Sequence, residues 1–459
     1  MQGTVNLALF CTGTMDKLEK MVYKNSSLIY KYKGVTAVPP LEMVDDVLTI
    51  SKCSITSVAM NSTVNAFMEN KKLTLSKKKC SVIHVGKSSG NCYDLRVHGD
   101  IMCKADSSKY LGDIINKSGK VKENIADRVV KAVASFAVIR AILEDIPLGR
   151  HRTEIVLELR QAMFLNRVLF NCKTWHNIKD ADIAELNLID NQLLRYVCSA
   201  HAKTPVEFLF LKTGAWPISY VIASRRMNYL REILTRDDNE LVKRVFCAQQ
   251  ASPSPGDFVK LVATDFERIG ESMDTSAICG MTKHDYKKHI KMKLNKAAFE
   301  ELSEIQGGHS KVNSFKYSKF SMQEYLKSPT FSNSETELLF ALRSHSVRGI
   351  KSNFSSVHKT NMSCLLGCES SKVDDQQHLL HCNTLLSLLS NTELELLSNM
   401  NYGDMYSTVS KQKRAVVIFS RLLDLRNKII QTKNILPTPT SGSTTLDTAP
   451  RASQGSGGK

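Results

Sequence analysis

The hydrophobic pattern of this chain changes near Val121, and that change constrains the fold more than any other feature. Beyond it, apolar residues recur three and four positions apart, as at Ile125, Val129, Val133, Phe136, Ile139 and Leu143. This spacing predicts an amphipathic helix, and similar stripes predict helices over 153–169, 180–198 and 217–234. Before Val121, short alternating runs are typical of strands. The sequence therefore predicts an α+β fold, with a mixed N-terminal part followed by a mainly α-helical remainder.

Two adjacent carboxylates, Asp45 and Asp46, interrupt an apolar run in the N-terminal part. The apolar residues on both sides predict two short strands with the aspartates at the turn between them. Like charges this close raise one another's pKa, and a divalent cation relieves the repulsion. Hard oxygen ligands at this spacing suit Mg²⁺. The alternative is an ordinary surface turn, because aspartate is a favoured turn residue.

Three more motifs flank the aspartate pair in a defined order. Gln2-Gly3 stands before it, and the segments Leu73-Thr74-Leu75-Ser76-Lys77-Lys78-Lys79-Cys80 and Tyr110-Leu111-Gly112 follow it. The ordered set resembles the reverse transcriptase of non-LTR retrotransposons, the long interspersed elements. The resemblance implies a polymerase palm over 1–120 and a helical thumb with its extension over 121–250.

The resemblance also implies roles for individual residues in an RNA-directed DNA polymerase. Asp45 would bind Mg²⁺ and Asp46 would support the same site, while Gln2 and Gly3 would position template or nucleotide. Lys79 would neutralise the pyrophosphate leaving group, where developing charge needs a nearby cation. The implied partners are an RNA template, a DNA target or primer, and deoxynucleotides.

The N-terminal end departs from that family. There, another metal-binding aspartate lies on a strand before the Gln-Gly turn, whereas this chain begins at Met1-Gln2-Gly3. Two-metal phosphoryl transfer needs ligands that bridge both ions, and the hairpin alone supplies too few of them. We therefore expect a truncated palm and a fragment that is inactive by itself. Val44 and Met43 also replace the alanine and the aromatic residue that usually precede the aspartates.

A second motif, Cys364-x3-Cys368-x9-His378-x3-Cys382, has the spacing of a zinc site. Zinc prefers four soft or borderline ligands arranged as two close pairs, and His378 and Cys382 fall on one face of a helical turn. His381 is a rival ligand that points elsewhere on that turn, and a cluster of buried thiols is the alternative to a metal site. We expect a zinc knuckle, which resembles the zinc-binding tail of the same family and would help to hold RNA or DNA.

The charge balance predicts a polyanionic partner. Lysine and arginine number 62 against 45 acidic residues, and the formal net charge is +17, which favours nucleic acid. A lysine-rich helix is predicted over 283–298. Phosphate contacts are expected from Lys287, Lys288, Lys291, Arg343, Arg348 and Lys351. A solvated helix face is the alternative for the lysines, and helix capping is the alternative for Arg343.

The remaining boundaries follow from composition. Ser252-Pro253-Ser254-Pro255-Gly256 predicts a linker, and the tail from Leu436 onward, rich in Pro, Thr, Ser and Gly, is predicted to be disordered. The expected units are then a helical basic region over 257–360, the zinc knuckle over 361–385, C-terminal helices over 386–435 and a tail over 436–459.

Cysteine usage and hydropathy bear on the compartment. No secretory leader is visible, and no apolar run reaches the ~20 residues that a membrane helix needs. Most of the 12 cysteines are scattered singly, which is typical of reduced thiols. We expect an intracellular protein, nuclear or cytoplasmic, without a membrane partner. A non-catalytic, zinc-containing nucleic-acid-binding protein is the alternative to the polymerase fragment.

Overall fold

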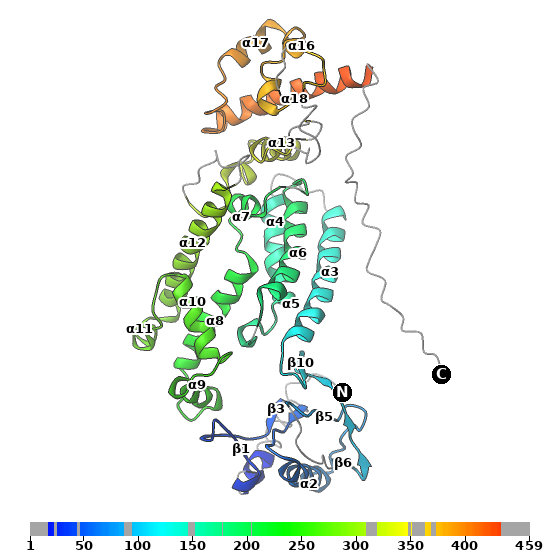
Figure 1. Cartoon of the computed structure of the whole chain (residues 1–459), viewed down its shortest axis with the longest axis vertical. Coiled ribbons are helices and arrows are strands. Elements are labelled where there is room, and N and C mark those ends of the chain that lie inside the picture. Colours follow the sequence, from blue (N-terminus) through cyan, green and yellow to red (C-terminus); the bar gives the residue numbers. More distant parts are fainter. Residues whose placement is uncertain are drawn as a thin grey trace, which may run out of the picture.

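The structure combines short strands at one end of an elongated molecule with helices along the rest of it. The computed structural model describes residues 17–22, 25–43, 46–86, 94–145, 152–176, 178–202, 204–308, 319–347, 350, 363–368 and 373–432. Figure 1 shows the strands below a central block of helices, and a small helical unit at the opposite end. The predicted α+β fold is confirmed.

Short strands around one long helix form the N-terminal part. The helix α2 (Ser54–Asn70) packs its buried Met60, Val64 and Phe67 against Leu18 and Val22. The strands are β1 (Tyr30–Tyr32), β2 (Thr36–Val38), β3 (Leu41–Met43), β4 (Asp46–Leu48), β5 (Ser81–Val82), β6 (Arg96–Val97), β7 (Asp100–Ile101), β8 (Cys103–Lys104), β9 (Ser107–Tyr110) and β10 (Asp113–Asn116).

The strands pair two by two. β3 and β4 are antiparallel, with Leu41 opposite Leu48 and Met43 opposite Asp46, so the predicted strand pair is confirmed. Within the described ranges there are five separate two-stranded sheets and no wider sheet, so the expected palm sheet is not seen there. Strands of two to four residues are shorter than those of ordinary sheets and offer few ladder hydrogen bonds.

The central helices follow the predicted hydrophobic stripes. They are α3 (Lys122–Asp145), α4 (Arg152–Leu159), α5 (Asn166–Val168), α6 (Asp180–Val197), α7 (Val206–Thr213) and α8 (Ile218–Leu234). The helix expected over 153–169 contains a π-helical segment, Arg160–Leu165, between α4 and α5. On α3, Ile125, Ile139 and Leu143 are buried as expected, whereas Val133 is 56% exposed, because it lies one residue beyond the core-facing Ala132.

The Ser252–Gly256 loop does not separate two cores. It joins α9 (Leu241–Ala251) to α10 (Phe258–Arg268), and one hydrophobic cluster contains residues from α8, α9, α10 and α12 (Lys283–Gly307). The short helix α11 (Thr275–Gly280) contributes Ile278 to the same cluster. The expected boundary between 250 and 257 is therefore wrong, since burial of shared apolar area joins the helices on both sides of the loop.

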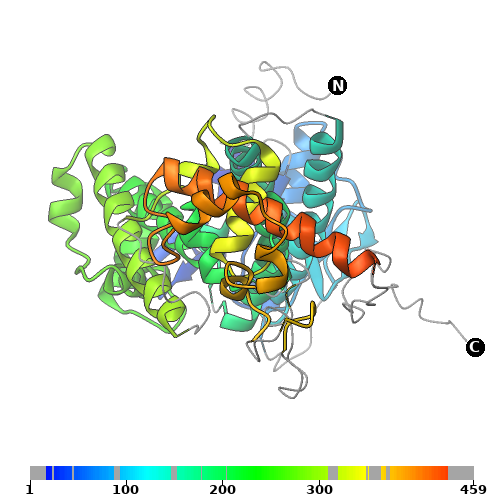
Figure 2. The ribbon, with the colours of Figure 1, turned by 90° about the horizontal axis from the view of Figure 1, so that it is seen from above.

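The C-terminal unit is organised around one long helix. Its elements are η4 (Glu324–Leu326), α13 (Asn333–Arg343), α15 (Gln376–Leu379), α16 (Asn383–Leu386), α17 (Asn391–Ser398) and α18 (Val409–Thr432). Phe419 and Leu422 of α18 pack with Leu342, Leu379 and Leu385. Seen from above in Figure 2, α18 lies across the central helices. The predicted tail over 436–459 lies outside the described residues.

None of the described helices combines the length and apolar character that crossing a membrane requires.

Candidate functional site

The first ligand pair of the predicted zinc site lies on a tight turn. Cys364 follows Ser363, which forms an isolated antiparallel bridge with Val373. The Gly367 amide donates to the Cys364 carbonyl over 3.1 Å, and Gly367 has a φ of +68°. Glycine adopts this left-handed conformation without a Cβ penalty. The turn therefore brings Cys368 back beside Cys364.

Two short helices hold the second ligand pair. Asp375 caps α15 by accepting the backbone N–H of His378 over 2.7 Å, which satisfies an otherwise unpaired helix donor. Cys382 precedes α16, and its carbonyl accepts the Leu385 amide over 2.9 Å. His378 and Cys382 come together as expected, but through two consecutive short helices and not on one helical turn, since α15 ends at Leu379.

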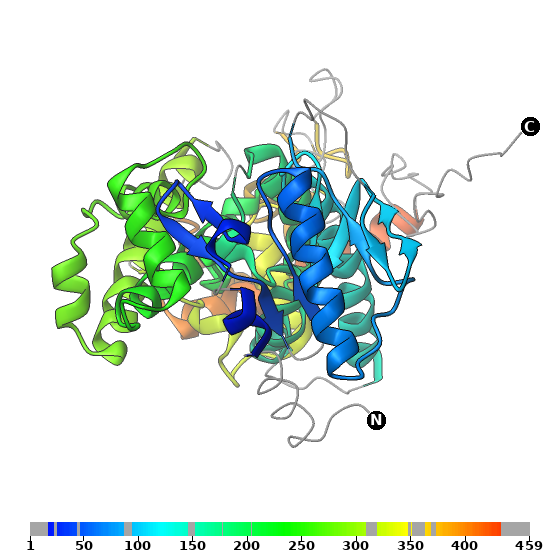
Figure 3. The same ribbon diagram turned by 90° about the horizontal axis from the view of Figure 1, so that it is seen from below.

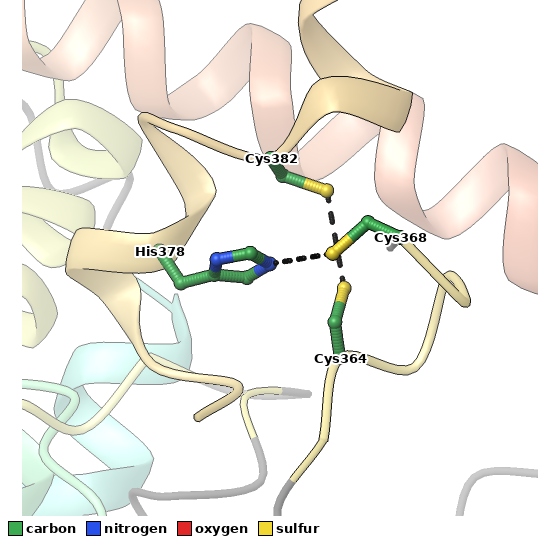
Figure 4. Close-up of side chains that lie close together, drawn as sticks. All are labelled: Cys364, Cys368, His378 and Cys382. Atoms are coloured by element: carbon green, nitrogen blue, oxygen red, sulfur yellow. Dashed lines mark hydrogen bonds between the residues drawn. The ribbon is translucent and has the colours of Figure 1, made fainter. Parts of the chain in front are cut away.

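The four side chains converge on one point, as Figure 4 shows. Their ligand atoms all lie within 4.8 Å of one another. The Cys364 and Cys382 Sγ atoms are 3.8 Å apart, and the Cys368 Sγ lies 3.3 Å from the His378 Nε2. A tetrahedral zinc with Zn–S bonds of about 2.3 Å separates its sulfur ligands by about 3.8 Å. The Cys3His arrangement therefore fits a zinc ion.

Burial at this cluster favours a metal over free thiols. Cys382 is fully buried, and Cys364 and His378 are less than a tenth exposed. The hydrogen bond with Cys382, followed by burial, raises the pKa of Cys364 to about 12. The same hydrogen bond lowers the pKa of Cys382 to about 7, although burial opposes the change. A bound zinc ion would stabilise the thiolates of such closely packed cysteines through its charge.

The rival ligand lies away from the cluster. His381 is exposed and is not among the converging residues. Within the described part of the chain, no other group of cysteine, histidine and acidic residues is placed to hold a metal ion. His378, and not His381, therefore lies where a metal could bind.

The aspartate hairpin lies at the other end of the molecule from the metal cluster (Figure 1). Asp46 begins β4 and is exposed, while Asp45, Gln2 and Gly3, along with Val44, lie outside the described residues. Lys79 is exposed on a turn, and no hydrogen bond or ion pair joins it to Asp46 among the residues described. The Mg²⁺ site expected from the sequence therefore stays a prediction.

Tyr110 of the Tyr-Leu-Gly motif connects to this hairpin. Its hydroxyl donates to the Leu41 carbonyl over 3.0 Å, and burial followed by the charges of Asp46 and Glu42 raises its pKa. Leu111 and Gly112 both have positive φ, as the tightest hairpin turns require. The two motifs that were separated in the sequence are thus neighbours.

Of the basic residues predicted to contact phosphate, three are exposed and one is buried. Lys287, Lys288 and Lys291 are exposed on α12, and none of them forms an ion pair within the described ranges. Arg343 is only 7% exposed, and its guanidinium stacks on the rings of Tyr325 and Tyr406. Its expected phosphate contact is therefore wrong, because the cation is enclosed by aromatic faces. Arg348 and Lys351 lie outside the described residues.

Known proteins offer no guide to these sites. The chain matches no protein-family model, no curated protein and no solved structure in the three comparisons made. Roles for its residues therefore rest on their own geometry and chemistry.

Sequence reasoning missed the groups that fix the metal cluster in place. Arg426 of α18 donates to both carboxylate oxygens of Asp374, ten residues after Cys364. The Gln376 amide donates to the Leu342 carbonyl and to the Tyr402 hydroxyl, each over 2.8 Å. Nothing in the local sequence pairs Asp374 with a residue 52 positions away. A basic residue within the apolar stripe of a helix, as Arg426 is between Leu422 and Ile429, was the available signal.

Proposed function

We propose that this chain belongs to the reverse transcriptases of non-LTR retrotransposons and contributes a zinc-containing, nucleic-acid-binding part of such an enzyme. The observation that carries the proposal is the Cys3His cluster, whose spacings suit tetrahedral zinc. The contact between Tyr110 and the aspartate hairpin supports it, because both motifs belong to the resemblance.

The basic face of α12 supports the choice of ligand. Lys287, Lys288 and Lys291 project from it without acidic partners in the described part of the chain, whereas Lys293 is paired with Glu271 over 2.7 Å. A row of unpaired cations suits the phosphates of a nucleic acid.

Salt dependence of binding tests this role. Binding of a fluorescent RNA hairpin and of a DNA duplex is measured by anisotropy between 50 and 200 mM salt, about the range over which phosphate contacts weaken strongly. Replacing Lys287 and Lys291 by Gln should reduce the log–log slope by up to about 2. The matched control replaces Lys293 and Lys296 of the same helix. These lysines pair with Glu271 and Glu300, and their replacement should change the slope less.

Two outcomes would contradict the nucleic-acid role. Binding that is insensitive to salt would favour a zinc-stabilised protein-interaction unit. Equal losses in the two lysine pairs would show that the α12 face does not carry the contact.

Primer extension tests the polymerase part of the proposal separately. A two-metal site needs carboxylates that bridge both ions, and Asp45 with Asp46 would provide only part of such a site. We expect the purified chain to incorporate no deoxynucleotide with Mg²⁺ or Mn²⁺. Incorporation that disappears in the variant Asp45→Asn would instead show that the chain is an active polymerase.

A further inference from the structure

The loop between α9 and α10 presents two Ser-Pro dipeptides to solvent. Ser252 and Ser254 are exposed, and so are the prolines that follow them. Two other Ser/Thr-Pro dipeptides lie in the described ranges. Thr204 is buried, and the half-buried Ser328 accepts the Thr330 amide. A proline-directed kinase has a site that accepts proline, which has no N–H, directly after the target serine. An exposed Ser-Pro pair suits such a kinase.

This loop is also docked against the N-terminal strands. The Lys33 ammonium donates to the Ser252 carbonyl over 2.6 Å and to the Ser254 Oγ over 2.8 Å. It also pairs with Asp257 over 2.9 Å, and both side chains are less than a sixth exposed. The Tyr32 hydroxyl donates to the same carboxylate over 3.2 Å. Figure 3 shows the β1–β2 hairpin against the green helical region that holds α9.

We propose that Ser254 is a phosphorylation site, and that its phosphate tightens the docking of the β1–β2 hairpin through Lys33. A proline-directed serine kinase would transfer the γ-phosphoryl group of ATP to the Ser254 Oγ. The bond from the γ-phosphorus to the β,γ-bridging oxygen breaks, an Oγ–P bond forms, and ADP leaves. The seryl proton passes to the general base of the kinase. This inference is independent of the proposed function.

Their contacts with Lys33 distinguish the two serines. Lys33 reaches the Ser254 side chain, whereas at Ser252 it reaches the backbone carbonyl. A phosphate on Ser254 would therefore form at the position of the lysine's present hydrogen-bond acceptor. Phosphate carries a charge of about −1.5 to −2 at neutral pH, and charge-assisted hydrogen bonds are about twice as strong as neutral ones.

The nearby carboxylate opposes this effect without cancelling it. Asp257 accepts the Ser254 amide over 2.7 Å, so the phosphate would lie close to one like charge. Lys33 lies between the two anions and is shielded from solvent. A phosphate before the first turn of α10 is also favoured by the helix dipole. The net result is a stronger attachment of Lys33, and with it the hairpin, to the loop.

The experiment uses the full chain, a proline-directed serine kinase and Mg-ATP, with the modified residues mapped by tandem mass spectrometry. Hydrogen exchange of the amides over 30–38 is then compared between the modified and unmodified protein. We expect phosphate on Ser254 and exchange that is slowed several-fold. The variant Ser254→Ala should lose the slowing, because it keeps the contacts of Lys33 with Asp257 and Ser252 but cannot be modified there. The matched variant Ser252→Ala should retain it.

A second variant tests whether Lys33 transmits the effect. Lys33→Gln should still accept phosphate on Ser254 but show no slower exchange than its unmodified form. The proposal is overturned if Ser254 stays unmodified while Ser252 is phosphorylated, or if phosphate on Ser254 leaves exchange over 30–38 unchanged or faster. Slower exchange that persists in Lys33→Gln would also overturn it, because the lysine would then have no part.

Discussion

Arg426 and Asp374 form a bidentate ion pair inside the C-terminal unit. The two hydrogen bonds measure 2.9 and 2.7 Å, and the exposed fractions of the two side chains are 1% and 0%. The pair joins α18 to the segment between the two halves of the metal cluster. A buried pair of this kind is tolerated because each charge neutralises the other, so the loss of either partner leaves an uncompensated charge.

Replacing Arg426 by Met should destabilise the C-terminal unit by about 3–5 kcal/mol, because the buried Asp374 carboxyl would lose its partner. The measurement is the midpoint of urea unfolding, with the unfolding monitored by circular dichroism. The double variant Asp374→Leu/Arg426→Met should recover much of the loss, since no buried charge then remains. A single variant as stable as the parent would contradict the buried geometry.

Zinc should be present at one ion per chain and should depend on the converging residues alone. Cys382→Ser removes a fully buried sulfur ligand and should release the metal, whereas His381→Ala should retain it because His381 lies outside the cluster. Metal analysis of the purified variants checks both. Removal of zinc by a chelator should also make the segment over 363–432 more sensitive to protease, because binding of a structural metal stabilises the folded state. Metal-free parent protein would refute the site.

Gly112→Ala should destabilise the N-terminal part by more than the 1–2 kcal/mol that a left-handed backbone costs, roughly, for a residue with a Cβ. Gly112 has a φ of +86°, and an added Cβ would lie 3.1 Å from the Phe170 ring. Gly270 is a matched control, because its φ is +71° and no atom lies within 4 Å of the corresponding Cβ. The difference in urea midpoint between the two variants therefore measures the part of the destabilisation that comes from the clash with Phe170. Equal midpoints would contradict the close approach of that ring to Gly112.

The docking of the β1–β2 hairpin should be sensitive to acid. Burial alone would raise the pKa of Asp257, but hydrogen bonds from Lys33 and the Ser254 amide outweigh it and hold the pKa below its usual value. A depressed carboxyl pKa contributes stability that is complete above the unfolded value of about 3.9 and is lost as the pH falls through the lower folded value. The hairpin should therefore stay docked at pH 5–6 and detach below about pH 4.

Pepsin cleavage over 25–43 across this pH range measures the detachment. In Asp257→Asn, which has no carboxylate to protonate, cleavage should show no step below pH 4 that is specific to the hairpin. A step that is the same in this variant and in the parent would assign the acid sensitivity to another group.

The sequence alone predicted the local elements well, for a physical reason. Helix and strand periods place apolar residues on one face within a few turns, so α3, α6, α8, α12 and the β3–β4 pair could be inferred from neighbours in the chain. The four predicted metal ligands could also be inferred locally. One turn and two consecutive short helices bring Cys364, Cys368, His378 and Cys382 together at the predicted spacing.

Only the tertiary structure decided which polar residues are buried and which distant segments meet. Arg343 and Lys287 are both basic residues of the region expected to be helical and basic, yet aromatic rings enclose the first and solvent surrounds the second. The pairing of Asp374 with Arg426 and the docking of Lys33 on the α9–α10 loop join residues that are far apart in the chain. Such contacts depend on how complete elements pack, and a local hydrophobic period contains no information about the partner. The sequence thus determined the elements and the Cys3His cluster, while packing determined the distant contacts that hold them in place.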